Sequence, residues 1–196
     1  MQAAEKAKVV ARVAPLFPIG AERPQFRGEI QTPVFLTEEE ARQTIIQEAQ
    51  KAGLVFASDR LRIDGVSIPA TVRHETTYLD TTNDGKSTIR IRSATDKEPM
   101  QKINLVLDGT DEKRKISYEF LSKEDYATWR HDKKTTYRDS MLQPSVALRE
   151  GLTQGIPAGT YAVFYDPGYG SKEQAKAQLR KQVLDFIAWL KAEGVI

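Results

Sequence analysis

The stretch that decides the fold is residues 160–196, which read TYAVFYDPGYGSKEQAKAQLRKQVLDFIAWLKAEGVI. Residues 161–165 form a short apolar and aromatic run bounded by turn-forming residues, which is typical of a strand covered on both faces. Asp166-Pro167-Gly168 ends this strand, because proline cannot donate to a ladder and glycine permits a positive φ. The stretch therefore opens with a predicted central strand.

The second part of this stretch predicts a long amphipathic helix. Ser171 stands as N-cap with Gln174 three residues later, which is the spacing of a capping box. Gly194 supplies the stop. One apolar stripe recurs at helical spacing between these ends: Leu179, Val183, Phe186, Ile187 and Leu190. A buried strand followed by such a helix favours a sheet covered by helices.

Earlier elements extend this pattern. Thr37 with Glu40 predicts a capped helix that ends at Gly53. Residues 71–79 and 87–92 predict one hairpin, and residues 102–107 and 115–121 predict a second. Further helices are expected from Ser122 and over residues 144–154. The order predicts an α+β (or α/β) fold, in which two hairpins and one parallel strand form a mixed sheet flanked by helices.

The first part of the chain has a different character. Four prolines within residues 1–34 argue against a continuous helix or a central strand. We therefore predict a partly ordered arm over residues 1–34 and a single globular domain over residues 35–196. The opening residues lack the apolar core of a signal peptide. The compartment is left open between the cytoplasm and, if a signal sequence has been removed, the periplasm or the exterior.

Composition excludes several functions. The chain has 196 residues and no cysteine, which removes disulfides, thiol nucleophiles and thiolate metal sites. Residues 1–34 hold five basic and three acidic side chains, which leaves 24 of each sign in the remainder. This balance gives no strong nucleic-acid signal. No run of apolar residues is long enough for a transmembrane segment, so we predict a soluble protein.

One enzyme class has a similar order of elements. Nucleases of the restriction-endonuclease-like fold place an Asp on one hairpin strand and a Glu-x-Lys on the next, so that carboxylates hold Mg²⁺ and the lysine steadies the attacking water. Asp108 and Glu119 are the corresponding catalytic candidates. Leu121 stands where the motif requires lysine. The order of elements therefore loosely resembles that fold, whereas its signature is incomplete.

A second candidate site is the turn before the last helix. Gly170, Ser171 and Lys172 lie at a helix N-terminus, where free amides and the helix dipole favour an anion. Lys172, Lys176 and Arg180 follow at four-residue spacing on one side of the helix. The alternatives are an ordinary capped turn and a solvated basic face. With only two histidines in the chain, no metal site and no cofactor is predicted.

Three blocks of the sequence resemble a family of bacterial proteins without an established function. They are FYDP followed by QVLDFIAWLKAEGVI, the segment PVFLTEEEARQTIIQEAQKAGL, and ISYEFLSKEDY. Some members of that family carry export or lipoprotein signals, so the resemblance implies that an envelope location is open. It implies no catalytic residues, because the matching blocks are mostly caps and core positions.

Two functions remain after these exclusions. We favour a binding or interaction module, whose partner is another protein or a second copy of the chain. The alternative is a divergent metal-dependent hydrolase with a nuclease-like fold that uses Asp108 and Glu119, or in which that site is degenerate or absent.

Overall fold

The computed structural model describes residues 11–17, 34–58, 61–70, 76–81, 87–92, 99–129, 141–166, 168 and 170–196. Most of the predicted N-terminal arm, the start and the tip of the first hairpin, and Pro167 lie outside these residues. The described helices are α1 (Glu38–Lys51), α2 (Lys123–Trp129), α3 (Leu142–Leu152) and α4 (Lys172–Ala192). The strands are β1 (Arg12–Val13), β2 (Arg62–Pro69), β3 (Thr76–Thr81), β4 (Ser87–Arg92), β5 (Met100–Val106), β6 (Gly109–Asp111), β7 (Ile116–Leu121) and β8 (Thr160–Tyr165).

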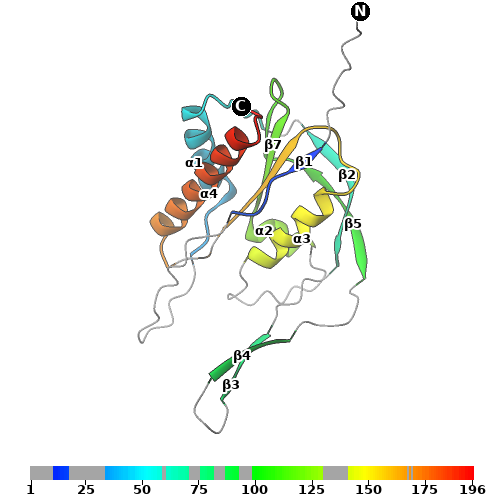
Figure 1. The fold of residues 1–196 in the computed structure, drawn as a ribbon, viewed down its shortest axis with the longest axis vertical. Helices are drawn as coiled ribbons and strands as arrows, with labels where there is room; N and C mark the ends of the chain where they lie inside the picture. Colours follow the sequence, from blue (N-terminus) through cyan, green and yellow to red (C-terminus); the bar gives the residue numbers. More distant parts are fainter. Residues whose placement is uncertain are drawn as a thin grey trace, which may run out of the picture.

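The central sheet has the strand order β1-β8-β7-β6 (Figure 1). Strand β8 runs parallel to β7 along its whole length, from Ile116 opposite Thr160 to Leu121 opposite Tyr165. Every residue of β8 is buried. The prediction of a doubly covered strand, placed parallel beside a hairpin strand, is therefore confirmed.

One of the two predicted hairpins pairs as expected and the other does not. Strands β3 and β4 are antiparallel partners. Strand β5 was expected beside β7, and it pairs instead with β2 in a separate sheet. The reason is a tighter turn further along the chain. Asp111 accepts a hydrogen bond from the Arg114 backbone N–H at 3.0 Å, and this turn closes the short β6–β7 hairpin. Strand β6 then occupies the place beside β7, and β5 is free to pair with β2.

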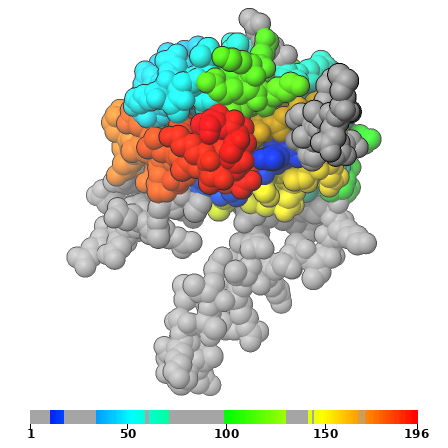
Figure 2. Space-filling model, turned by 45° about the horizontal axis from the view of Figure 1, so that its top comes forward, coloured from blue at the N-terminus to red at the C-terminus, as the bar shows by residue number. Residues whose placement is uncertain are grey.

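Helices cover both faces of the central sheet. Helices α1 and α4 lie side by side over one face, where Tyr118, Phe120 and Phe164 form part of the core (Figures 1 and 2). Helix α3 and the β2–β5 pair pack over Tyr161 and Val163 on the other face. The whole predicted stripe of α4 is buried. A mixed sheet flanked by helices confirms the α+β class.

Two features of β8 could not be read from its own residues. Strand β1 extends the sheet, but it pairs only with Thr160 and Tyr161. Further along the same strand, the Gln182 side chain accepts from the Tyr165 N–H at 3.2 Å and donates to the Tyr165 carbonyl at 2.9 Å. Because an unpaired buried backbone group is costly, this side chain from α4 satisfies the backbone of Tyr165 on the side where none of the described strands pairs with it.

The helix caps follow the sequence closely. Thr37 and Glu40 form a reciprocal capping box at the start of α1. Ser171 accepts from the Gln174 N–H at the start of α4. None of the helices in the described part of the chain is long and apolar enough to cross a membrane. The caps matter for the site below, because they fix where the acidic side chains at the helix starts lie.

Candidate functional site: an acidic hollow

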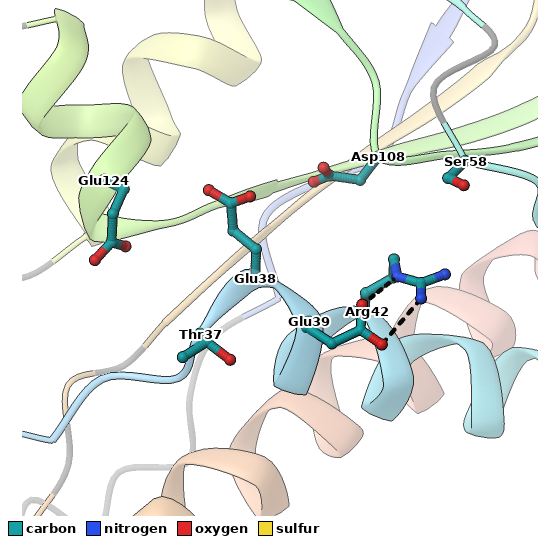
Figure 3. A pocket seen from close by; sticks show the side chains of 7 residues that line it. All are labelled: Thr37, Glu38, Glu39, Arg42, Ser58, Asp108 and Glu124. Carbon is teal, nitrogen blue, oxygen red and sulfur yellow. Dashed lines mark hydrogen bonds and ion pairs between the residues drawn. The ribbon is translucent and has the colours of Figure 1, made fainter.

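Strands β7 and β8 are parallel, so their carboxyl ends meet at one edge of the sheet. Such edges are where open α/β sheets bind ligands. Helices α1 and α2 both begin at this edge, and a hollow of about 720 Å³ opens beside it. Seven residues line this acidic hollow: Thr37, Glu38, Glu39, Arg42, Ser58, Asp108 and Glu124 (Figure 3).

The lining carries four carboxyl groups and one guanidinium. Arg42 binds Glu39 through two contacts, at 2.8 Å and 3.0 Å. In the described part of the chain, neither Glu38 nor Glu124 has an ion-pair partner. Figure 3 shows the Glu38 side chain pointing between Glu124 and Asp108. The acidic hollow therefore has an excess of negative charge.

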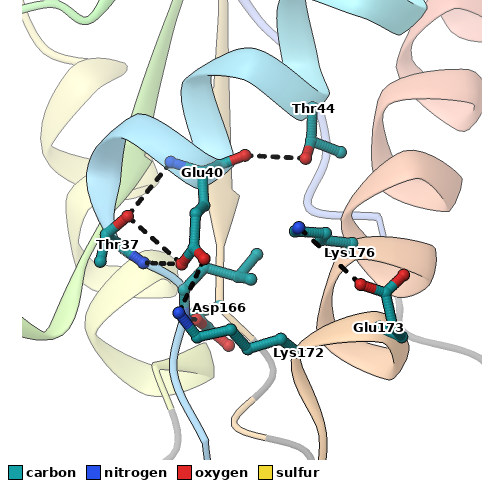
Figure 4. A network of polar contacts seen from close by, with 8 residues as sticks. Thr37, Glu40, Thr44, Asp166, Lys172, Glu173 and Lys176 are labelled. Carbon is teal, nitrogen blue, oxygen red and sulfur yellow. Dashed lines mark hydrogen bonds and ion pairs between the residues drawn. The ribbon is translucent and has the colours of Figure 1, made fainter.

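The helix starts place these carboxylates. Glu38, Glu39 and Glu40 occupy consecutive positions in the first turn of α1, so their side chains point in directions about 100° apart. Glu38 accepts a hydrogen bond from Ser122 at 3.1 Å, and Glu39 binds Arg42. Glu40 points away from the acidic hollow and binds Lys172 of α4 at 2.7 Å (Figure 4). Three consecutive glutamates of α1 therefore have three different partners: Ser122, Arg42 and Lys172.

Ser122 connects α1 to α2 below the acidic hollow. Its hydroxyl lies 3.1 Å from the Glu38 carboxylate and 2.8 Å from that of Asp125, and it accepts from the Asp125 N–H at 3.0 Å. The Asp125 carboxylate also accepts from the Ser122 N–H at 3.1 Å. This reciprocal cap holds two carboxylates near one buried hydroxyl.

Both predicted catalytic residues lie at this place. Asp108 lines the acidic hollow and accepts a hydrogen bond from the Phe120 N–H at 2.7 Å. Its own N–H donates to Glu119. Glu119 is only 5% exposed, and its Oε2 atom has no hydrogen-bond partner among the described residues. The structure therefore brings Asp108 and Glu119 together, although only Asp108 lines the acidic hollow.

The surroundings of Glu119 favour its neutral form. Burial raises the pKa of this carboxyl well above its ordinary value of 4.5, and the negative charges of Asp108, Asp125 and Glu38 raise it further. The N–H of Asp108 opposes this shift. Glu119 therefore gives up its proton less readily than an exposed glutamate does, and it lies near two carboxylates that line the acidic hollow, those of Asp108 and Glu38.

Asp166 at the end of β8 is a second buried carboxyl at this edge. It accepts from the backbone N–H groups of Leu36 and Gly168, the latter at 2.8 Å. Burial raises its pKa, these two hydrogen bonds oppose the shift, and the charges of Glu124 and Glu40 add to it. Asp166 holds the start of α1 against the end of β8, which is a positioning role for the residues of the acidic hollow.

The residues predicted for an anion site lie elsewhere and have other contacts. Gly170 is exposed in the turn, the Ser171 hydroxyl caps α4, and Lys172 binds Glu40 of α1 (Figure 4). Arg180 lies 3.9 Å from Glu48 of α1, so two cations of the basic row pair across to the neighbouring helix. We call this set the α1–α4 seam: Glu40, Glu48, Lys172 and Arg180.

A nuclease-type metal centre does not fit the residues present. The position that requires lysine is Leu121, which is fully buried against Tyr126, Met141 and Tyr165. Within the described ranges, no group of three or more His, Asp or Glu side chains is arranged to hold a metal ion.

Four acidic residues of this site were not predicted: Glu38, Glu39, Glu124 and Asp125. Each lies at the start of a helix that the sequence does predict. They could have been found from the predicted topology. If two helices begin where two parallel strands end, the acidic residues in the first turns of both helices gather at that edge of the sheet.

No protein-family model matches this sequence, and neither the curated proteins nor the solved structures that were searched include a similar chain. The resemblance to a bacterial family stays a prediction.

Proposed function

We propose that this protein is a binding module whose acidic hollow receives a cationic group of its partner, such as a lysine or arginine side chain of a protein segment. The observation that carries this proposal is the convergence of four carboxyl groups, from α1, the β5–β6 link and α2, against one guanidinium. A cation that enters relieves the repulsion among these groups and is attracted by all of them.

The dimensions suit an organic cation. A volume of about 720 Å³ lies within the range of roughly 300–1,000 Å³ typical of ligand pockets and exceeds what one basic side chain fills. The carboxylates are distributed around this volume, on different elements, which suits a cation that carries several N–H donors. Arginine and lysine carry five and three such donors respectively.

Charge also determines how the complex should respond to salt. Exposed ion pairs are worth roughly 0.2–1 kcal/mol each, and added salt screens them. Binding through the acidic hollow is therefore expected to be modest in affinity for a single side chain and to weaken steadily as the ionic strength rises. A partner with two or more basic residues gains from the surrounding negative charge.

The test is calorimetric titration with tetralysine amide, with tetraglutamate as the reference peptide. We expect binding of tetralysine only, weakened by salt. The double variant Glu38→Gln/Glu124→Gln removes two charges from the acidic hollow and should weaken binding about fivefold, at roughly 0.5 kcal/mol for each. The matched control Glu150→Gln/Glu173→Gln removes two exposed carboxylates elsewhere and should leave the affinity within about 1.5-fold.

Two results would contradict the proposal. One is the absence of tetralysine binding at low salt. The other is an equal loss of affinity in the control variant, which would assign binding to overall charge. If sedimentation velocity shows a dimer that the double variant dissociates, the basic side chain comes from a second copy of the chain.

A second candidate is the divergent metal-dependent hydrolase. It is favoured by one observation, namely that Asp108 and Glu119 are neighbours and that Glu119 has a raised pKa. A buried carboxyl with a raised pKa beside a second carboxyl is the kind of pair that acid–base catalysis uses. Hydrolysis of bis-p-nitrophenyl phosphate with Mn²⁺, lost in Asp108→Asn, supports this candidate. A thermal unfolding midpoint unchanged by millimolar Mg²⁺ or Mn²⁺ argues against it.

A further inference from the structure

Glu119 lies close enough to three carboxyl groups at or beside the acidic hollow, those of Asp108, Asp125 and Glu38, for their charges to act on it. It is on β7, directly opposite Val163 of β8, and 95% of it is buried, since its exposed fraction is 5%. One carboxyl oxygen has no hydrogen-bond partner in the described part of the chain. A buried polar atom in this state is uncommon in proteins, because it forfeits hydration without a replacement. The binding role proposed above does not by itself explain this carboxyl.

The charged groups that bear on Glu119 come from three elements packed around it. They are Asp108 from the β5–β6 link, Asp125 from α2, and Glu38 from α1. All three are acidic, and Glu119 takes part in none of the ion pairs among the described residues. Two of them, Asp108 and Glu38, also line the acidic hollow. The same side chains therefore face the ligand on one side and influence Glu119 on the other.

We propose that a cation bound in the acidic hollow displaces the proton of Glu119, so that the site binds its ligand more tightly as the pH rises. This proposal rests on the proposed binding function. The proton leaves the carboxyl oxygen for a buffer molecule, and the Glu119 carboxylate remains ionised next to Asp108, which lines the acidic hollow. No other bond is formed or broken.

The physical reason is a change in the local charge. Without ligand, an ionised Glu119 adds one more negative charge to three that already bear on it, in a place with little water. An opposite charge within about 4–6 Å lowers the pKa of a carboxyl by roughly 1–3 units. A bound ammonium or guanidinium therefore reverses part of the repulsion. Linkage makes this effect reciprocal. A cation that lowers the proton affinity of Glu119 is itself bound more tightly by the protein in which Glu119 has lost its proton.

The linkage has a definite sign and upper limit. The carboxyl binds its proton more tightly in the free protein than in the complex. Affinity should therefore rise with pH across the interval between the two pKa values, by at most about tenfold per pH unit for one proton. Above that interval the affinity should level off.

The first experiment uses the unmodified protein. Tetralysine amide is titrated at several pH values between 5 and 8, in pairs of buffers that differ in their enthalpy of ionisation. We expect tighter binding at higher pH, by up to about tenfold per unit, and a buffer-dependent heat that corresponds to release of up to one proton for each peptide bound.

Two variants assign the proton to its residue. Glu119→Gln keeps the shape and remains uncharged, so its affinity should vary with pH by less than about twofold. The matched control Glu48→Gln alters another buried glutamate, in the α1–α4 seam, and should keep the pH dependence of the unmodified protein.

The outcomes separate the two proposals. Peptide binding without pH dependence or proton release overturns the role of Glu119 and leaves the binding function standing. An unchanged pH dependence in Glu119→Gln also overturns this role, because the proton then belongs to another group. No binding of tetralysine at any pH overturns the binding function, and the linkage with it.

Discussion

The acidic hollow and the α1–α4 seam hold similar numbers of charged side chains and arrange them in opposite ways. In the seam, Lys172 binds Glu40 at 2.7 Å and Arg180 lies 3.9 Å from Glu48. In the acidic hollow, four carboxyl groups accompany one guanidinium, that of Arg42, which binds Glu39. Charges that are paired across two helices hold those helices together, whereas charges of one sign that face a space attract a partner.

The difference arises within a single turn of helix. Glu38 and Glu40 are two positions apart in α1. Because each helical residue turns about 100°, Glu38 faces the acidic hollow and Glu40 faces α4. Composition and spacing would give these residues the same role. Their surroundings give Glu38 a role in binding and Glu40 a role in holding the helices together. Each role can be tested by substitution in the acidic hollow or in the α1–α4 seam.

The largest expected effect concerns the core beneath the α1–α4 seam. Phe186 of α4 is buried and lies in edge contact with Phe164 of β8, with ring centroids 5.7 Å apart. Phe186→Ala should lower the free energy of unfolding by about 3–5 kcal/mol, since it removes a large side chain and leaves a cavity. Urea denaturation measures this change. A loss below about 1 kcal/mol would mean that α4 contributes little to the core.

The same variant sharpens the comparison. Under conditions in which Phe186→Ala is folded, its affinity for tetralysine should remain within about twofold of the unmodified protein. A much larger loss of affinity would show that the acidic hollow depends on the packing of α4.

A smaller effect is expected for the charges of the seam. A double-mutant cycle with Glu40→Gln and Lys172→Met should give a coupling of roughly 0.2–1 kcal/mol, because this ion pair is partly exposed. The hydrogen bond from Lys172 is the largest cause that lowers the pKa of Glu40, to about 2. This depressed value means that the coupling is fully present above about pH 4.5 and is lost as the pH falls towards 2.

Urea denaturation at pH 7 and pH 3 measures that coupling. The Glu173–Lys176 pair, which lies within α4 at 3.8 Å, is the control and should give a smaller value. A coupling at pH 3 as large as that at pH 7 would contradict the assignment to an ion pair.

Much of this fold follows from local sequence signals. The caps at Thr37 and Ser171, the apolar stripe of α4 and the buried run of β8 each have a short-range cause, and each was predicted. The pairing of β5 was not, because a hairpin could close at two turns and the side chain of Asp111 decides between them. The hydrogen bonds between the Gln182 side chain and the Tyr165 backbone were not predicted either, because they join α4 to β8.

The site was predictable only in part. Asp108 and Glu119 were selected because the order of elements loosely resembles that of restriction-endonuclease-like nucleases, and the structure places them together. The other acidic residues of the acidic hollow come from two helix starts that the topology brings to one edge. The sequence of one segment predicts its own helix cap, but it does not predict which other helix caps lie close to it in the folded protein.

Binding of a cation by the acidic hollow, and not by the α1–α4 seam, is tested by removing one carboxylate from each region in the same titration. Asp108→Asn removes a charge from the acidic hollow and keeps an oxygen to accept from the Phe120 N–H. Glu40→Gln removes a charge from the seam. Tetralysine should bind about threefold more weakly to Asp108→Asn, and its affinity for Glu40→Gln should stay within about 1.5-fold of that for the unmodified protein. Equal affinities for the two variants would contradict this expectation.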